Sequence, residues 1–265
     1  LGTCLDRVRE TTPLVHNITN YVTVNDVANV LLACGGSPIM SDDIQDVEDI
    51  TSICGGLNIN IGTLNQNTIP SMFAAGKKAN ELGHPVVLDP VGVGASPWRL
   101  GQVRDLLDGF TPAILRVNLG EAQALLGDDG REQGVDSPLP ASRTGRRDFA
   151  RSLARRRRTA VLLTGPEDLI TDGQRVWCVT GGSGQMSLVT GTGCMLSVLC
   201  GVFAAVEPDA ALAAALASAF WKVCARRAER LAAGRGSGSF RTALLDAANT
   251  LTAPDAAREA EIAPL

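Results

Sequence analysis

Short apolar runs alternate with helix-like segments along most of this chain, and this alternation constrains its fold more than any other feature. The stretches 85–90 and 159–164 each hold an uninterrupted apolar run, which is typical of strands buried on both faces of a sheet. The segments 22–33 and 68–82 have apolar residues at helical spacing, and glycines follow both. Repeated alternation of this kind predicts an α/β fold with three α/β/α layers and a mostly parallel central sheet.

The other expected elements continue the same pattern. Further strands are expected at 14–16, 37–40, 56–61 and 113–117, and further helices at 4–9, 103–107, 121–126, 146–158 and 241–250. The segments 169–171 and 176–179 flank Asp172-Gly173, which favours a β-hairpin. The apolar segments 198–206 and 210–220 are expected to form two core helices, because Glu207-Pro208-Asp209 separates them. A polar, acidic loop should follow residue 40, and the polar stretch 128–144 should be another loop.

Length and composition allow a single large domain over residues 1–265, with a frayed tail beyond about residue 252. The net charge of −4 argues against a nucleic-acid surface, and no apolar run is long enough to span a bilayer. The seven cysteines are scattered without a C-x-x-C pair, which disfavours a zinc site and a disulfide framework. Residues 1–10 carry charges and lack the apolar segment of a signal peptide, so we expect a cytoplasmic protein.

A glycine-rich turn precedes the first of the two apolar core helices. Gly191 and Gly193 allow a tight turn that brings backbone N–H groups close to a ligand, and the helix-like run 195–206 follows directly. The N–H groups of Gly191, Thr192 and Gly193 would then form an anion hole, because helix N-termini attract negative charge. Cys194 would lie in the first turn, where the same field favours its thiolate. The alternative is an ordinary loop that only caps a core helix.

Polar residues gather where the expected strands end, which is where ligands bind in open α/β sheets. They include 40–42, Asp89, Arg116, Asn118, Glu121, Thr164 and 191–194. Two carboxylates, an amide and a guanidinium in one crevice suit Mg²⁺ together with a polyphosphate. The simpler explanation for Asp89 or Glu121 taken alone is that each only caps a turn or a helix. Thr164-Gly165 has a hydroxyl and a glycine that suit contact with a phosphate, although this signal is weak by itself.

Other motifs contribute less to a function. The stretch 143–158 holds eight arginines and one acid, and a solvated helix face explains it better than a nucleic-acid or phosphate site. The two histidines, His16 and His84, have no cysteine or acid at ligand spacing, so a metal site through them is not expected. The chain has no G-x-S-x-G elbow and no Walker A motif, and 182–185 does not fit a dinucleotide-binding fingerprint.

Several motifs together resemble the hydroxyethylthiazole kinase family. They are PLVHNITNY at 13–21, GSPIM at 36–40, NIGTL at 60–64, VVLDPVGVG at 86–94, VTGTGCMLS at 189–197 and GSFR at 238–241. They occur in the order found in that family and extend over nearly the whole chain, from about residue 5 to residue 252. The combination of HNITN, LDPVGVG and TGTGC is specific to this family.

The resemblance implies a ribokinase-like fold and ATP-dependent phosphorylation of 4-methyl-5-(2-hydroxyethyl)thiazole, a salvage step in thiamine biosynthesis. It also implies a homotrimer with active sites between subunits, and no nucleic-acid or membrane partner. Carried over by motif, the substrate residues are Met40, Asn20, Val22 and Gly191, the Mg²⁺ residues are Asp89 and Glu121, and the ATP residues are Arg116, Thr164 and Asn118. Cys194 stands where most ribokinase-like enzymes have a catalytic aspartate.

One segment departs from the family pattern. The family has Arg-Gly-Asn-Ala-Ser-Glu where this chain has Arg-Val-Asn-Leu-Gly-Glu at 116–121, so Val117 and Leu119 add bulk near the expected nucleotide. Three alternatives stay open: a related kinase for hydroxymethylpyrimidine or another small alcohol, with a different pocket around Met40; a thiazole or nucleotide sensor that has lost catalysis through the altered 116–121 segment; and an NAD(P)H-hydrate repair enzyme.

Overall fold

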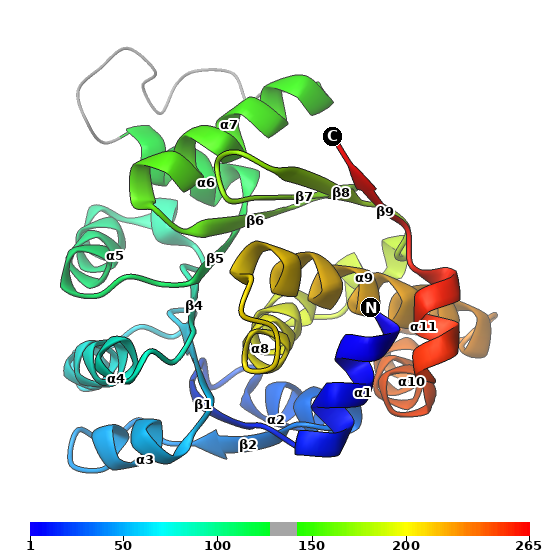
Figure 1. Ribbon diagram of the computed structural model, residues 1–265, viewed down its shortest axis with the longest axis horizontal. Coiled ribbons are helices and arrows are strands. Elements are labelled where there is room, and N and C mark those ends of the chain that lie inside the picture. Colours follow the sequence, from blue (N-terminus) through cyan, green and yellow to red (C-terminus); the bar gives the residue numbers. More distant parts are fainter. Residues whose placement is uncertain (128–141) are drawn as a thin grey trace.

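The central sheet has the strand order β2-β1-β3-β4-β5-β6-β7-β8-β9 in the computed structural model, which describes residues 1–127 and 142–265 (Figure 1). Strands β1 to β6 pair in parallel, and β7, β8 and β9 pair antiparallel at one edge. The strands are β1 Leu14–Ile18, β2 Ser37–Met40, β3 Gly56–Asn60, β4 Val86–Asp89, β5 Ile114–Asn118, β6 Ala160–Thr164, β7 Asp168–Thr171, β8 Val176–Val179 and β9 Ile262–Pro264.

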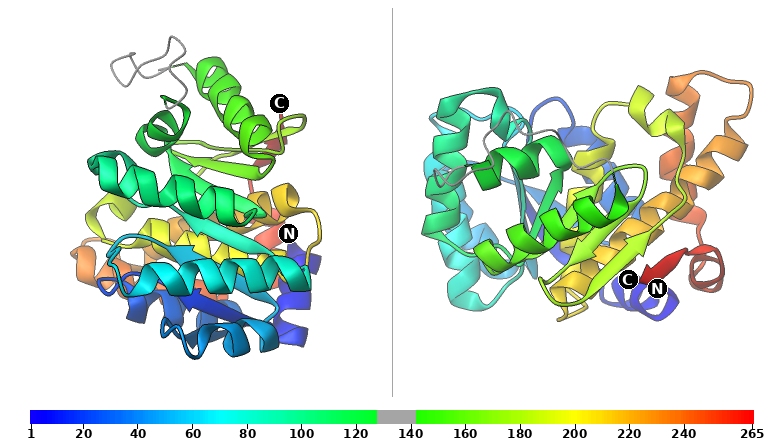
Figure 2. Two further views of the ribbon diagram at one scale, coloured as in Figure 1. Left: turned by 90° about the vertical axis from the view of Figure 1, so that its left-hand side faces the viewer. Right: turned by 90° about the horizontal axis from the view of Figure 1, so that it is seen from above.

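Helices cover both faces of this sheet (Figures 1 and 2). The α-helices are α1 Gly2–Thr11, α2 Val24–Cys34, α3 Val47–Ile53, α4 Thr68–Leu82, α5 Pro97–Gly109, α6 Leu119–Leu126, α7 Arg143–Arg157, α8 Thr192–Ala204, α9 Ala210–Leu231, α10 Ser237–Thr250 and α11 Ala253–Glu259. The short 3₁₀ helices are η1 Val93–Ala95 and η3 Gly184–Leu188. Helices α3 to α7 lie on one face, and α1, α2 and α8 to α11 lie on the other. The predicted three-layer α/β/α fold with a mostly parallel sheet is confirmed.

Helix α8 is central to the second layer. It contacts β1, β3 and β4 and is covered by α2 and α9, so almost all of its side chains are buried. Small and branched aliphatic side chains fill this layer together with Phe203, Phe220 and Trp221. The burial of both sides of α8 fixes the position of its N-terminus at the carboxyl edge of the sheet, which is where the glycine-rich turn enters.

Strand register aligns the polar residues at that edge. Asn60 of β3 is paired with Asp89 of β4, and Asn118 of β5 is paired with Thr164 of β6. The strand order reverses at β1, because β2 lies on one side of it and β3 on the other. Such a reversal opens a crevice beyond the strand ends, and this one lies beside the N-terminus of α8.

One expectation about the fold is wrong, and one helix was not predicted. The polar, acidic loop expected after β2 is present at 41–46, and α3, which follows it, packs through the buried Val47 and Thr51. The tail beyond residue 252 was expected to fray, but it forms α11 and β9. Thr252 caps α11 by accepting from the backbone N–H of Asp255 at 3.3 Å, and β9 pairs with β8.

Other local expectations are confirmed. The hairpin of β7 and β8 turns at Asp172-Gly173, where Gly173 has a φ of 93°. The two apolar segments are α8 and α9. The expected loop at 128–144 lies mostly outside the described residues, and its last two residues, 143 and 144, belong to α7. None of the described helices has both the length and the apolarity needed to cross a bilayer.

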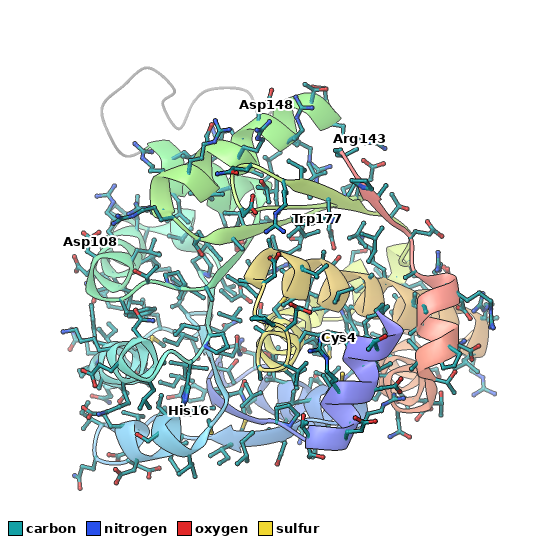
Figure 3. The ribbon with its side chains drawn as sticks, viewed as in Figure 1. Cys4, His16, Asp108, Arg143, Asp148 and Trp177 are labelled. Carbon is teal, nitrogen blue, oxygen red and sulfur yellow. The ribbon has the colours of Figure 1, made fainter. Side chains whose placement is uncertain are left out.

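His16 has a structural role. Its ring is fully buried between β1 and α3, with Nδ1 2.9 Å from Thr51 Oγ1 and Nε2 2.9 Å from the Ser41 carbonyl (Figure 3). Burial lowers the pKa of His16, with the Ser41 carbonyl and Asp46 acting in the opposite direction. The imidazole therefore joins the acidic segment after β2 to the sheet.

Candidate active site

The N-terminus of α8 begins with a glycine that no other residue could replace without strain. Gly191 has a φ of 83°, and a Cβ built on it would lie 2.4 Å from Thr23 Cγ2. The Gly191 carbonyl accepts the N–H of Met195 at 2.8 Å, which starts the helix. Among the described residues, the backbone N–H groups of Thr192, Gly193 and Cys194 have no carbonyl partner, as expected in a first helical turn. The turn therefore leaves three backbone donors with the geometry that an anion would need.

Gly193 brings this turn against a buried guanidinium. A Cβ on Gly193 would lie 2.6 Å from Arg116 Nη2, so only glycine permits the observed approach. The side chain of Arg116 is 12% exposed and projects from β5 towards the N-terminus of α8. Its Nη2 donates to Thr164 Oγ1 at 3.1 Å, and Thr164 donates to the Val117 carbonyl at 3.2 Å. Its Nε is buried without a hydrogen-bond partner among the described residues, so the protein does not satisfy every donor of this guanidinium.

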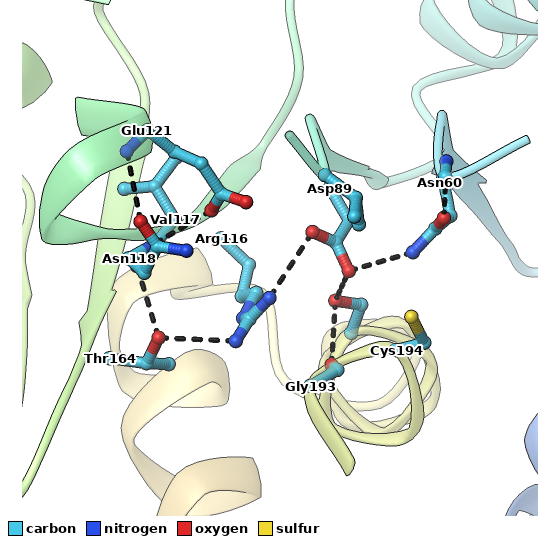
Figure 4. A network of polar contacts seen from close by, with 12 residues as sticks. Asn60, Asp89, Arg116, Val117, Asn118, Glu121, Thr164, Gly193 and Cys194 are labelled. Atoms are coloured by element: carbon cyan, nitrogen blue, oxygen red, sulfur yellow. Dashed lines mark hydrogen bonds and ion pairs between the residues drawn. The ribbon is translucent and has the colours of Figure 1, made fainter. Parts of the chain in front are cut away.

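Asp89 is at the centre of a polar network that joins the strand ends to α8 (Figure 4). The carboxylate is fully buried, and its Oδ1 accepts from Arg116 Nη1 at 3.3 Å. Its Oδ2 accepts from Asn60 Nδ2 at 2.8 Å and from Ser197 Oγ at 2.6 Å. Burial raises the pKa of Asp89, and Arg116, Ser197 and Asn60 offset this only in part.

Glu121 takes part in a capping box at the start of α6. Its Oε2 accepts the Asn118 N–H at 2.8 Å, and its own N–H donates to Asn118 Oδ1 at 2.9 Å. Its Oε1 accepts the Gly92 N–H at 3.1 Å, which ties the loop after β4 to α6. Burial raises the pKa of Glu121, whereas the Asn118 N–H and the charge of Arg116 lower it. The capping function considered for Glu121 is therefore real, and the carboxylate still lies within the electrostatic reach of Arg116.

The two buried carboxylates have only one guanidinium between them, so this part of the site has an excess of negative charge. Asp89 Oδ2 already accepts two hydrogen bonds, whereas Asp89 Oδ1 and both oxygens of Glu121 each accept one and keep a second lone pair free. Among the described residues, no group of three or more His, Cys, Asp or Glu side chains could enclose a metal ion. Magnesium commonly binds through one or two carboxylates, substrate phosphates and several waters, so Asp89 and Glu121 fit an ion that arrives with a polyphosphate.

The thiol of Cys194 is partly buried and accepts from Asn20 Nδ2 at 3.3 Å. Burial raises the pKa of Cys194, the nearby Asp89 carboxylate raises it further, and hydrogen bonds from Thr23, Asn60 and Asn20 act against this. The raised pKa runs against the expectation that the helix N-terminus would favour a thiolate, and its causes are burial and the neighbouring Asp89 carboxylate.

A cavity of about 590 Å³ opens beside this network. Its inner wall consists of Thr192, Gly193, Arg116 and Thr164, and its outer wall includes the glycine-rich loop 181–184 and the α9 residue Lys222. Of the expected nucleotide residues, Arg116 and Thr164 line the cavity. Asn118 does not line it, and its side chain caps α6 instead.

The expected substrate residues are only partly brought together. Asn20 is buried and links to the network, because its Nδ2 donates to Asn60 Oδ1 at 3.0 Å as well as to Cys194. Met40 ends β2 beside Asn17 and is half-buried. Val22 is 68% exposed and lies outside the network within this chain.

Two residues that organise the site were not predicted from the sequence. Asn60 bridges Asn20 and Asp89, and Ser197 joins Asp89 to α8 by also donating to the Gly193 carbonyl at 3.1 Å. Ser197 could have been found, because it follows Gly193 by one helical turn and so shares its face. The alternation of asparagine with apolar residues in 57–61 was the only signal for Asn60.

Solved structures share this architecture. A hydroxyethylthiazole kinase protein from Pyrococcus horikoshii matches with a TM-score of 0.88 and 37% identity, over 99% of this chain and 98% of that one. A pyridoxal kinase from Staphylococcus aureus matches with a TM-score of 0.68 at 16% identity, over 96% and 98% of the two chains, which supports the ribokinase-like fold alone.

Sequence comparisons agree with the structural ones. A hydroxyethylthiazole kinase from Clostridium beijerinckii is 46% identical over 255 residues, which cover 95% of this chain and 92% of the relative. The hydroxyethylthiazole kinase from Alkaliphilus oremlandii is 41% identical over 263 residues, which cover 99% and 97%. The model of the hydroxyethylthiazole kinase family matches residues 5–254. This chain therefore belongs to the hydroxyethylthiazole kinase family.

Proposed function

We propose that this enzyme transfers the γ-phosphoryl group of ATP to the hydroxyl of 4-methyl-5-(2-hydroxyethyl)thiazole, a salvage step in thiamine biosynthesis. The observation that carries the proposal is the convergence of the unpartnered N–H groups at 192–194 with Arg116 and Asp89, beside a cavity of about 590 Å³. The kinase reaction is inferred from the family of the chain, and the thiazole substrate is inferred from the names of its relatives.

The nucleotide occupies the cavity with its γ-phosphate at the N-terminus of α8. Arg116 and Thr164 hold the phosphate chain, and the N–H groups of Thr192, Gly193 and Cys194 donate to the transferring phosphoryl group. Support comes from the donors that the protein leaves unsatisfied at both places. Asp89 and Glu121 would hold Mg²⁺, and the ion would supply neutralisation of phosphate charge.

The reaction is an in-line transfer, in which the thiazole oxygen bonds to the γ-phosphorus as the bond to the β-phosphate bridging oxygen breaks. Phosphoryl transfer has a loose transition state, so positioning and charge neutralisation matter more than a strong base. A thiol whose pKa is raised is a weak proton acceptor at neutral pH, so Cys194 contributes mainly by lining the acceptor end of the site. Met40, Asn20, Val22 and Gly191 are the proposed contacts of the thiazole.

Substitutions of Cys194 test this view of the thiol. We expect Cys194→Ala to lower kcat by no more than about tenfold, because little general-base catalysis is lost. Cys194→Asp should keep or raise kcat, since a carboxylate accepts the alcohol proton better and Asn20 can donate to it. Steady-state kinetics on both folded variants provide the measurement. Complete inactivity of both would contradict this role and indicate a covalent nucleophile.

The pH profile should reflect the two buried carboxyls. Burial raises the pKa of both Asp89 and Glu121, so each takes up a proton at a higher pH than an ordinary carboxyl group does. Because only the ionised pair binds Mg²⁺, kcat/KM should fall with decreasing pH, with its acid limb above the ordinary carboxyl values of about 4. A pH profile at Mg²⁺ concentrations well below saturation measures this limb, because saturating metal would displace the protons and shift the limb to lower pH. An acid limb at or below about pH 4 would contradict it.

We also propose a homotrimer with active sites between subunits, in the cytoplasm. The exposed Tyr21 and Val22, at 62% and 68%, lie directly after the site residue Asn20 and would be covered by a neighbouring subunit. The seven cysteines are all free thiols, which fits a reducing compartment. Light scattering on the purified protein tests the trimer.

The test of the function is product identification. The protein is incubated with ATP, Mg²⁺ and the thiazole alcohol, and in parallel with hydroxymethylpyrimidine. Mass spectrometry should detect the phosphorylated thiazole as the favoured product. ATP consumption with the pyrimidine alcohol and none with the thiazole would contradict the proposed substrate.

A further inference from the structure

Lys222 places an ammonium group in the wall of the nucleotide cavity, although no motif pointed to it. It lies in α9, which packs beside α8, and the residue is only 8% exposed (Figure 1). Lysine is almost never this buried without a purpose or a strong partner. The preceding residue, Trp221, anchors this part of α9 by donating its Nε1 hydrogen to the Thr192 carbonyl at 3.0 Å. The ammonium is therefore held at a fixed place relative to the N-terminus of α8.

The contacts of this ammonium are long. Its Nζ lies 3.4 Å from Asp168 Oδ1 and 3.4 Å from the Pro166 carbonyl. Charge-assisted hydrogen bonds are usually about 2.7–2.9 Å long, and an ammonium has three donors. Lys222 is thus incompletely satisfied by the protein, although it borders a cavity.

Asp168 does not depend on Lys222 for its own hydrogen bonds. It accepts the Gly165 N–H at 3.0 Å and the Ser218 hydroxyl at 2.8 Å, and these two contacts hold the β6–β7 turn against α9. If Lys222 served only to pair with Asp168, its contact with that carboxylate would be expected to be shorter than those of Gly165 and Ser218. The two partners of Asp168 therefore leave the ammonium available to a ligand.

The loop opposite Lys222 leaves room for a ligand. Gly181 and Gly182 have φ values of 91° and 90°, and a Cβ on Gly182 would lie 3.5 Å from Lys222 Cγ and 3.9 Å from its Nζ. The glycine backbone can therefore lie close to the lysine without a side chain between the ammonium and the cavity. The charged side chains that line the cavity are Arg116, Asp168 and Lys222, and Arg116 also pairs with Asp89, which is not part of the lining.

We propose that Lys222 binds the phosphate chain of the nucleotide from the wall of the cavity formed by α9, as a second cation in addition to Arg116. The inference rests on the proposed function, because it takes the cavity to be the nucleotide site. A compact, strongly hydrated ammonium is suited to a phosphate oxygen as a point charge. Asp168, the carboxylate among the described lining residues, already accepts hydrogen bonds from Gly165 and Ser218. The β6–β7 turn, which begins at Thr164, brings the two cations to one ligand.

The experiment measures equilibrium binding of MgADP and of adenosine by calorimetry, with no thiazole present. Lys222→Met should raise the Kd of MgADP by about tenfold, which is the usual value of one hydrogen bond to a charged group. The Kd of adenosine should change by less than about twofold, because adenosine has no phosphate for Lys222 to bind. The variant Lys222→Met/Asp168→Asn should show the same loss for MgADP, and it removes the unpaired buried carboxylate that could unfold the single variant.

Arg226→Met is the matched control. Arg226 lies one turn further along α9 and supports the same loop, because a Cβ on Gly181 would lie 2.9 Å from its Nη1, but it does not line the cavity. Its guanidinium pairs with Glu261. Binding of MgADP should be unchanged in this variant if Lys222 acts by touching phosphate rather than by supporting the loop.

Three results would overturn the proposal: unchanged MgADP binding in the double variant, an equal loss of adenosine binding, or an equal loss of MgADP binding in Arg226→Met. The first would make Lys222 a structural ion pair, the second a nucleoside contact and the third a support for the loop. These results are separate from the proposed function. If the unmodified protein bound MgADP tightly but did not phosphorylate the thiazole, the proposed substrate would be wrong. The proposed role of Lys222 in binding phosphate would still stand.

Discussion

Asp89→Ala should reduce kcat/KM by about a thousandfold or more, which corresponds to about 4 kcal/mol of transition-state stabilisation. The substitution removes a proposed Mg²⁺ ligand and releases Arg116, Asn60 and Ser197 from the positions in which they are held. Steady-state kinetics with saturating Mg²⁺ measure the loss. Removing one partner of a buried ion pair costs about 3–5 kcal/mol of stability, so thermal unfolding must be followed in parallel.

Asp26→Ala separates the loss of chemistry from the loss of stability. Asp26 is also a buried aspartate paired with an arginine, since it accepts from Arg241 Nε at 2.9 Å, but it lies in α2 outside the polar network. It should lower the melting temperature by less than Asp89→Ala does, because the Arg241 side chain is 48% exposed, and leave kcat/KM within about threefold, a change of less than 1 kcal/mol. A folded Asp89→Ala variant with more than about a tenth of the original kcat/KM would remove Asp89 from the proposed site.

Gly191→Ala should lower kcat/KM by about a hundredfold and destabilise the fold by roughly 1–3 kcal/mol. Alanine is strained at a φ of 83°, and its Cβ would lie 2.4 Å from Thr23 Cγ2. The turn must then shift, and with it the N–H donors of the first turn of α8. Losing one such donor costs about 3 kcal/mol in comparable sites. Kinetics and chemical denaturation measure the two effects.

Two further variants sharpen this test. Thr23→Ser in the Gly191→Ala background removes Cγ2 and should recover part of the activity, because it relieves the contact but not the backbone strain. Gly101→Ala lies in α5 with nothing within 4 Å of the added Cβ, and should stabilise the protein by about 0.5–1 kcal/mol without affecting kinetics. A fully active Gly191→Ala variant would show that the geometry of this turn does not control the reaction.

The parts of the site that lie at strand ends could be predicted from the sequence. In a parallel sheet, residues that end neighbouring strands meet at one edge, so the positions of Asp89, Arg116 and Thr164 predicted their proximity without any coordinates. The two glycines before an apolar run predicted the anion-binding turn for a similar reason. A tight turn leading into a buried helix leaves the first N–H groups exposed to a ligand.

Features that depend on burial or on distant contacts could not be predicted in this way. The protonation of Cys194 depends on the low solvation of its surroundings and on Asp89, more than a hundred residues earlier in the chain. The position of Lys222 depends on how α9 packs against the β6–β7 turn, which no local pattern encodes. By contrast, the helix after Thr252 had a local signal that was overlooked, since a threonine cap followed by Pro254 is typical of a helix start.

We place the transfer of the phosphoryl group at the N-terminus of α8. A crystal structure with Mg²⁺, a non-hydrolysable ATP analogue and the thiazole alcohol tests this most directly. We expect γ-phosphate oxygens within about 3 Å of the backbone nitrogens of Thr192, Gly193 and Cys194, with the thiazole hydroxyl in line on the opposite side from the β-phosphate. A γ-phosphate bound away from these nitrogens, or a thiazole that cannot reach it, would contradict the account.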